Sequence, residues 1–257
     1  MNIFSPIGVF DSGVGGISVL KTLTTLLPGE DFIYFGDTKN APYGTKSEAE
    51  VLRLSSSVMS FLAARDIKAA VIACNTATAA AAARLREQYT FPIIGMEPAL
   101  KLAHDSVENN GRILVMATPS TIASEKYDHL RSLYGQNALS VSCPGLMEYV
   151  ERLETDSPSL HRYLDGIFTD QVRDGLSAVV LGCTHYVFLR EVIRRHINAD
   201  TLILDGNMGT ARQLQRRLAE RDLLKPDGKD GSVTLLSSGD ESSVKIMHDL
   251  LQEKLAI

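Results

Sequence analysis

Long apolar runs and blocks of basic residues are missing from this chain of 257 residues. No apolar stretch approaches the ~18 residues expected of a membrane-spanning helix, so we expect no membrane span. Lys and Arg number 26 against 31 Asp and Glu, giving a net charge of −5 with no basic block, which argues against nucleic-acid binding. The N-terminus lacks a basic segment followed by an apolar one, so no signal peptide is predicted.

Cysteine is also scarce. Cys74, Cys143 and Cys183 are the three in the chain, and no CxxC spacing occurs. Three scattered cysteines cannot form a disulfide framework, so a reduced, cytoplasmic protein is the expectation. His185 follows Cys183 by two residues, but a zinc site needs three or four ligands and no second group has suitable spacing, so we predict no metal. No lysine has a setting typical of pyridoxal phosphate, and no cofactor is predicted.

What is present is an ordinary globular composition, 44% hydrophobic and 22% charged. Short β-rich runs alternate with segments of helical periodicity, such as 47–65, where apolar residues recur near every third or fourth position. This alternation predicts an α/β fold with mainly parallel sheets. The candidate strands are 7–10, 32–35, 70–73, 92–94, 113–116, 139–142, 179–181, 202–204 and 233–236.

The chain also contains an internal repeat. The strand–turn–helix pattern that begins at Ile7 begins again at Ile113, and a second pair of matching segments is separated by a similar interval, from Cys74 to Cys183. We therefore expect two similar α/β lobes with a site in the cleft between them. The predicted first lobe comprises 1–97 and 212–257, and the second comprises 98–211.

Cys74 and Cys183 occupy the same local context, each ending a short apolar run and preceding polar residues and a helix-like segment. A helix N-terminus lowers the pKa of a thiol from its usual ~8.5. A thiolate can take a proton from carbon and a thiol can return one, so a facing pair suits a racemase or epimerase. The alternative is that both are ordinary buried cysteines.

A glycine-rich turn follows the first candidate strand. Its residues, Asp11 to Gly16, read as GxGG with no lysine, so they match neither a P-loop nor a dinucleotide turn. We expect a turn that presents backbone N–H groups to a small anion, with Asp11 as a base or relay. The competing interpretation is a helix N-cap, a role that Asp and Ser both favour.

Four further residues near the expected strand ends are candidates. His185 is placed to hydrogen-bond the Cys183 thiolate or to relay a proton. Glu148 and Glu151 lie one turn apart on a predicted helix, and each is either an acid–base partner or part of a solvated face. Cys143, followed by Pro144, is read as core packing.

Eight segments, taken together, resemble the glutamate racemases, the cofactor-independent members of the aspartate/glutamate racemase group. They span almost the whole chain, and the paired cysteine motifs are the most specific of them. One departure is Glu148, which stands where the group usually has proline. The segments are 10–16, 41–44, 73–77, 95–98, 117–122, 143–144, 182–186 and 238–240.

The resemblance implies two flavodoxin-like lobes with glutamate bound between them, a possible homodimer, and a role in supplying D-glutamate for bacterial peptidoglycan. It implies that Cys74 and Cys183 are the two proton donor–acceptors, that Asp11 assists Cys74, and that His185 and Glu151 act on the Cys183 side. The implied substrate contacts are Asp11, Ser12, Tyr43, Gly44, Asn75, Thr76, Thr118, Thr121, Thr184 and His185.

Three alternatives stay open at this point. A racemase acting on aspartate or another small acid would use the same features. A thiol hydrolase or isomerase would depend on one cysteine as a covalent nucleophile. A non-catalytic protein that binds a small acid in the same cleft would bind its ligand without exchanging protons with solvent.

Overall fold

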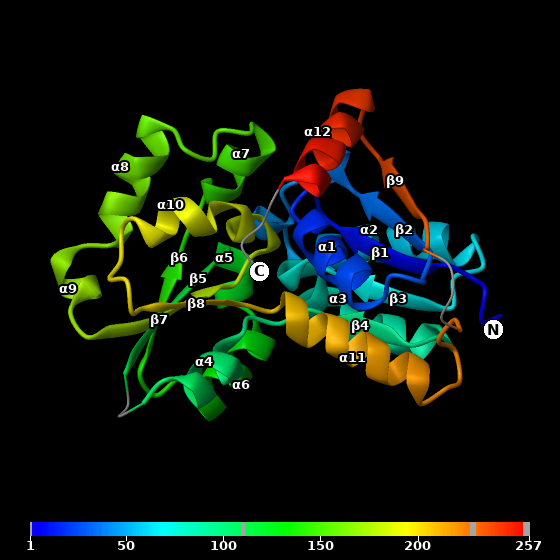
Figure 1. Ribbon diagram of the computed structural model, residues 1–257, viewed down its shortest axis with the longest axis horizontal. Helices are drawn as coiled ribbons and strands as arrows, with labels where there is room; N and C mark the ends of the chain where they lie inside the picture. The colour runs from blue at the N-terminus through cyan, green and yellow to red at the C-terminus, as the bar shows by residue number, and fades with distance from the viewer. Residues whose placement is uncertain (1, 109–110, 227–229, 254–257) are drawn as a thin grey trace.

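Two α/β lobes lie side by side in the computed structural model, which describes residues 2–108, 111–226 and 230–253 (Figure 1). Each of the nine candidate strands has a counterpart, with ends that coincide or differ by at most three residues. None of the described helices is both long enough and apolar enough to cross a membrane.

The first lobe is built on a parallel sheet of five strands in the order β4-β3-β1-β2-β9. The central strand β1 is buried along its whole length, because helices cover both faces of the sheet. Residues that alternate along it therefore join two separate cores, Ile7 and Val9 on one face and Phe10 on the other. The strands are β1 (Ile7–Asp11), β2 (Phe32–Gly36), β3 (Ala69–Ile72), β4 (Ile93–Gly95) and β9 (Val233–Ser237).

The second lobe repeats this design with four parallel strands in the order β6-β5-β7-β8. Counted within each lobe, the first four strands have the same order, 2-1-3-4, which is typical of flavodoxin-like sheets. The internal repeat expected from the sequence is therefore confirmed. The strands are β5 (Arg112–Ala117), β6 (Ala138–Ser142), β7 (Leu176–Leu181) and β8 (Leu202–Asp205).

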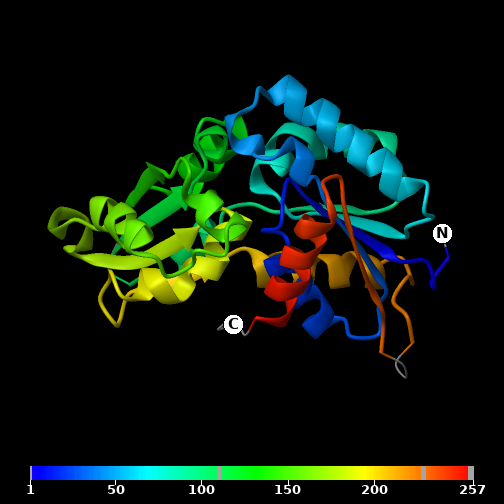
Figure 2. The same cartoon turned by 90° about the horizontal axis from the view of Figure 1, so that it is seen from above.

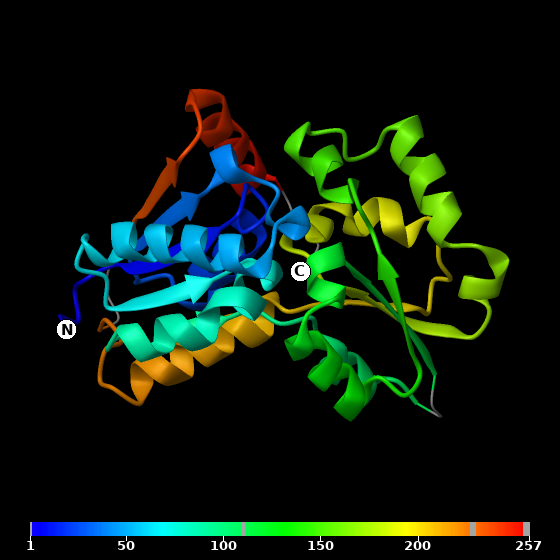
Figure 3. The ribbon, with the colours of Figure 1, turned by 180° about the vertical axis from the view of Figure 1, so that it is seen from behind.

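Helices cover both faces of each sheet (Figures 1, 2 and 3). In the first lobe α2 and α3 cover one face, while α1, α11 and α12 cover the other. These helices are α1 (Ile17–Leu26), α2 (Glu48–Ala63), α3 (Asn75–Gln88), α11 (Asn207–Ala219) and α12 (Glu241–Gln252). The second lobe carries α4 (Leu100–Ser106), α5 (Pro119–Ile122), α6 (Glu125–Tyr134), α7 (Leu146–Glu151), α8 (Pro158–Ile167), α9 (Asp170–Arg173) and α10 (Arg190–Arg194).

Local sequence explains where these helices begin. The hydroxyl of Ser47 accepts a hydrogen bond from the N–H of Glu50 and caps α2, whose apolar residues Val51, Leu54 and Val58 face the core. In α3 the alanine-rich stretch favours helix by propensity, and Cys74 occupies the capping position. The matching strand end in the second lobe differs, because Cys183 precedes a 3₁₀ helix, η3 (Thr184–Leu189), before α10 begins.

The chain crosses between the lobes twice, after β4 and after β8. On its return it enters α11, which packs against α1 and β4 of the first lobe. The predicted limit between residues 211 and 212 falls inside this helix. The domain limits of 1–97 with 212–257 and 98–211 remain a prediction.

Candidate active site

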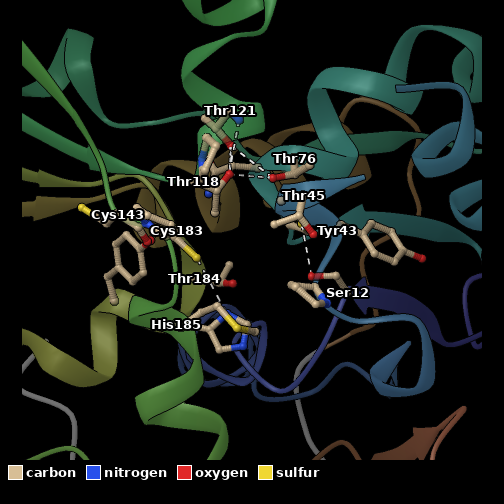
Figure 4. A pocket seen from close by; sticks show the side chains of 18 of the residues that line it. Ser12, Tyr43, Thr45, Thr76, Thr118, Thr121, Cys143, Cys183, Thr184 and His185 are labelled. Carbon is tan, nitrogen blue, oxygen red and sulfur yellow. Dashed lines mark hydrogen bonds between the residues drawn. The ribbon is translucent and has the colours of Figure 1, made fainter. Parts of the chain in front are cut away.

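A pocket lies where the carboxyl ends of the strands of the two lobes face one another (Figure 4). Open α/β sheets bind ligands beyond the carboxyl ends of their strands, and this pocket has that position for both sheets at once. The lining residues are Ser12, Pro42, Tyr43, Gly44, Thr45, Cys74, Asn75, Thr76, Thr118, Pro119, Thr121, Cys143, Pro144, Gly145, Met147, Glu148, Gly182, Cys183, Thr184, His185 and Tyr186.

Cys74 lies in the wall of this pocket, just after β3, the third strand of the first lobe. Its side chain is only 7% exposed. The sulfur accepts a hydrogen bond from the N–H of Ala77 at 3.4 Å, and its S–H donates to Oγ of Ser12 at 3.6 Å. Burial, reinforced by the charge of Asp11, raises the pKa of this thiol to about 12. The sequence-based expectation of a lowered pKa is wrong here, because desolvation outweighs the N–H groups at the start of the helix.

Cys183 occupies the equivalent strand end in the second lobe, and it belongs to a chain of hydrogen-bonding groups. Nδ1 of His185 lies 3.7 Å from its sulfur, and Nε2 of the same ring lies 2.8 Å from Oε1 of Glu151. Burial alone would lower the pKa of His185, but its two partners together raise the pKa well above its usual value. Burial opposes ionisation of Glu151 as well, yet the contacts with His185 lower its pKa. The geometry therefore favours an imidazolium between a carboxylate and a sulfur.

Asp11 lies beneath the pocket at the end of β1 and is fully buried. One carboxylate oxygen accepts from the N–H of Gly13 at 2.9 Å, and the other accepts from Oγ1 of Thr184 at 3.0 Å. Burial raises the pKa of Asp11, against the opposing charge of His185. The N-cap alternative for this residue is wrong, because α1 begins after Gly16 and has no side-chain cap.

Three threonine hydroxyls form a triangle on one side of the pocket (Figure 4). Oγ1 of Thr76, from the first lobe, lies 3.0 Å from Oγ1 of Thr118 and 3.2 Å from Oγ1 of Thr121, both from the second lobe. Thr118 and Thr121 are also 3.0 Å apart. A hydroxyl can rotate to donate elsewhere, so this triangle offers several donors to an anionic group.

Neutral groups complete the lining. The hydroxyl of Tyr43 donates to Oδ2 of Asp37 at 2.6 Å, which fixes the ring at the pocket wall. Gly44 lies against Thr118, where an added Cβ would come within 2.9 Å of the threonine Cβ. Oδ1 of Asn75 is buried and has no hydrogen-bond partner in the structure, so it is available to a ligand's N–H group.

The electrostatic character of the pocket follows from this inventory. Among its lining residues neither lysine nor arginine occurs, so His185 is the one basic side chain there. Carboxylates would be held by hydroxyl and backbone N–H donors rather than by ion pairs. Within the described ranges no three or more His, Cys, Asp or Glu side chains are grouped to hold a metal.

The structure brings most of the predicted site residues to this pocket, with Asp11 and Glu151 immediately behind it. Glu148 also lines the pocket, but its carboxylate lies 3.3 Å from Arg152, whereas Glu151 turns to His185. Cys143 is buried as expected and also reaches the lining. Tyr186 also lines the pocket, and it was not predicted from the sequence. Its position next to His185, in the segment that follows Cys183, could have indicated it.

Comparison with known proteins places these features in a family. The family model described as "Asp/Glu/Hydantoin racemase" matches residues 7–214. A glutamate racemase of Clostridium novyi is 47% identical over 251 residues, covering 96% of each chain. The crystal structure of glutamate racemase from Thermus thermophilus in complex with β-chloro-D-alanine is 36% identical, with a TM-score of 0.85 and coverage of 99% of this chain and 96% of that one. That of the RacE1 isoform from Bacillus anthracis is 32% identical, with a TM-score of 0.87 and coverage of 98% and 95%.

These relatives match nearly the full length of the chain, and their sequence identities are high enough to show common family membership as well as a common fold. The protein is an enzyme of the isomerase class, and the chain belongs to the Asp/Glu/Hydantoin racemase family.

Proposed function

We propose that this enzyme interconverts L-glutamate and D-glutamate by a two-base mechanism in which Cys74 and Cys183 act on opposite faces of Cα. The observation that carries the proposal is the pair of thiol-bearing strand ends, one in each lobe, that line the same pocket. The names of the relatives support glutamate as the substrate.

The proposed starting state has one thiol and one thiolate. Cys74 keeps its proton, because burial raises its pKa to about 12. Cys183 is the thiolate, stabilised by the His185 imidazolium 3.7 Å from its sulfur. The Cys183 thiolate removes the α-proton, and the Cys74 S–H delivers its own proton to the other face of the carbanion. The reverse direction exchanges these roles, and no proton is lost or gained overall.

The carbanion is the difficult species, since its charge develops beside a carboxylate. We propose that the hydroxyls of Thr76, Thr118 and Thr121 hold one substrate carboxylate and that Oδ1 of Asn75 accepts from the substrate ammonium. The remaining proposed contacts are Ser12, Tyr43, Gly44, Thr184 and His185, which line the pocket, while Asp11, buried beneath it, is proposed to assist Cys74. Such donors stabilise charge best when water is excluded and their positions are fixed beforehand.

The first test is to incubate the purified protein with L-glutamate in D₂O without added cofactor and to follow Cα exchange by NMR and chirality by chromatography. Deuterium at Cα together with D-glutamate supports the proposal. Exchange with aspartate but not with glutamate would move the assignment to the other dicarboxylate. Binding without exchange would indicate a non-catalytic role.

The second test changes each thiol separately. Cys74→Ser and Cys183→Ser should each nearly abolish racemisation in both directions, because the enantiomers are equally stable and one missing base blocks both paths. Cys143→Ser is the control for replacing a buried thiol in the same pocket, since Cys143 follows the edge strand β6 rather than the third strand of a lobe. Full turnover by Cys74→Ser would contradict the mechanism.

We also propose that the D-glutamate product supplies peptidoglycan synthesis, and that the chain forms a homodimer. Growth of a D-glutamate auxotroph carrying this sequence tests the first proposal. Light scattering of the purified protein tests the second.

A further inference from the structure

Tyr34 is a buried tyrosine of the first lobe that the mechanism above does not use. It lies on β2, has no exposed surface, and does not line the pocket, so it touches no substrate. Its hydroxyl donates a hydrogen bond to the carbonyl oxygen of Gly13 at 2.8 Å. A tyrosine hydroxyl buried against one backbone carbonyl fixes the orientation of that peptide plane.

The same peptide unit has a second partner on its other side. The N–H that belongs with the Gly13 carbonyl is that of Val14, and it donates to Oε1 of Glu151 at 3.3 Å. Glu151 comes from the second lobe and accepts from His185, which in turn faces Cys183. One peptide unit thus connects a hydroxyl in the core of the first lobe to the thiol of the second.

The packing around this peptide leaves it little freedom. A Cβ at Gly13 would lie 2.4 Å from Oε1 of Glu151, and a Cβ at Gly16 would lie 2.9 Å from the hydroxyl of Tyr34. The N–H of Gly13 is also engaged, with the carboxylate of Asp11. The glycine turn therefore serves as a contact surface between the lobes, and its orientation bears on both halves of the site.

We propose that Tyr34 is a positioning residue for the reaction: its hydroxyl holds the Gly13–Val14 peptide so that the Val14 N–H points at Glu151 and keeps the Glu151–His185–Cys183 chain aligned. This inference rests on the proposed function, because that chain matters only if Cys183 transfers protons. A hydrogen bond accepted by the carbonyl also polarises the peptide and strengthens its N–H as a donor.

The groups that influence Glu151 are few. His185 of η3 and the Val14 N–H favour its carboxylate form. The negative charge of Glu151 in turn raises the pKa of Asp11 on β1 and of the neutral Tyr34 hydroxyl on β2, although burial is the larger cause for both. Removal of the Tyr34 hydroxyl should weaken the Val14 contact and raise the pKa of Glu151, with the neighbouring charges unchanged.

The test is Tyr34→Phe, with Tyr127→Phe as the matched control. Tyr127 is also a buried tyrosine, and its hydroxyl bonds only Ser140, in the second lobe. We expect Tyr34→Phe to lower kcat about tenfold, the upper end of the range for one lost neutral hydrogen bond, with little change in KM. The acid limb of its kcat/KM profile should move to higher pH, while the control keeps the wild-type profile.

Two further measurements separate positioning from a general loss of stability. In a Glu151→Gln background the added Tyr34→Phe change should have little effect on kcat. Replacing Tyr34 by 3-fluorotyrosine keeps the hydroxyl but makes it a stronger donor, and should move the acid limb to lower pH. An unchanged pH profile in Tyr34→Phe, or full additivity with Glu151→Gln, would overturn the inference. Absence of racemisation by the wild-type protein would instead refute the proposed function itself.

Discussion

Replacing Gly15 by alanine is the sharpest steric test of how the two lobes meet. A Cβ at this position would lie 2.3 Å from Nδ1 of His185 and 2.6 Å from Oγ1 of Thr184. The backbone there has a φ that any residue can adopt, so the substitution introduces a clash without backbone strain. Both neighbours are buried and hydrogen-bonded, and neither is the mobile end of a long side chain.

The size of the effect follows from these distances. Ordinary contact begins near 3.4 Å, so the imidazole of His185 or the glycine turn must move by about 1 Å. A displacement of that size in a catalytic group lowers the rate by about 100-fold. Overpacking of this kind also lowers the free energy of unfolding by about 1–3 kcal/mol.

The assay is steady-state racemisation in both directions, combined with urea unfolding. Gly166→Ala is the matched control, because Gly166 lies inside α8 and a Cβ there would meet nothing within 4 Å. Alanine in a helix should stabilise that variant by about 0.5–1 kcal/mol and leave kcat unchanged. Wild-type kcat in Gly15→Ala would refute the argument that the lobes meet through this turn.

Three other predictions follow. Thr76→Val should raise KM by about tenfold or more with a smaller effect on kcat, as measured by initial rates, because it removes one donor to a carboxylate. Lys68→Met should lower the free energy of unfolding, measured in urea, by about 3–5 kcal/mol, since it leaves the buried carboxylate of Glu30 without its ion-pair partner. Lys225→Met breaks a more exposed ion pair, with Asp31, and should lower the free energy of unfolding by about 1 kcal/mol or less. The pKa of Glu151 lies below its usual 4.5, so the stability that it contributes is present above that pH and is lost as pH falls through the lowered value. Glu151→Gln should therefore show a shallower loss of stability on acidification, measured by thermal unfolding from pH 6 downward.

The sequence predicted the sheets better than the helices of the second lobe. Apolar runs such as 113–116 identify buried parallel strands directly, because both of their faces are covered. The short helices α5, α7 and α9 have only four to six residues and too few turns for periodicity to register. Their positions depend on tertiary packing, which a single sequence does not display.

The site residues were predictable where a motif repeats and unpredictable where the environment decides. The matched contexts of Cys74 and Cys183 predicted that the two thiols share a cleft, and both line the same pocket. The pKa of Cys74 was predicted in the wrong direction, because the sequence reveals a helix start but not the burial that outweighs it. The role of Asp11 as an acceptor from Thr184 depends on a contact between distant segments, and nothing in the spacing indicates it.

The hydrogen bonds that join the two lobes are also hydrogen bonds of the proposed catalytic groups. Asp11 accepts from Thr184 across the interface, the Val14 N–H reaches Glu151, and Ser18 donates to the carbonyl of Thr184. Separating the lobes to admit substrate must break these bonds and leave the relay behind Cys183 without its support from the first lobe. Under the proposed mechanism, this arrangement would limit proton removal to the closed state, in which water is excluded and the carbanion is protected. We therefore expect lobe movement, rather than proton transfer, to limit turnover, and expect kcat to fall as solvent viscosity rises.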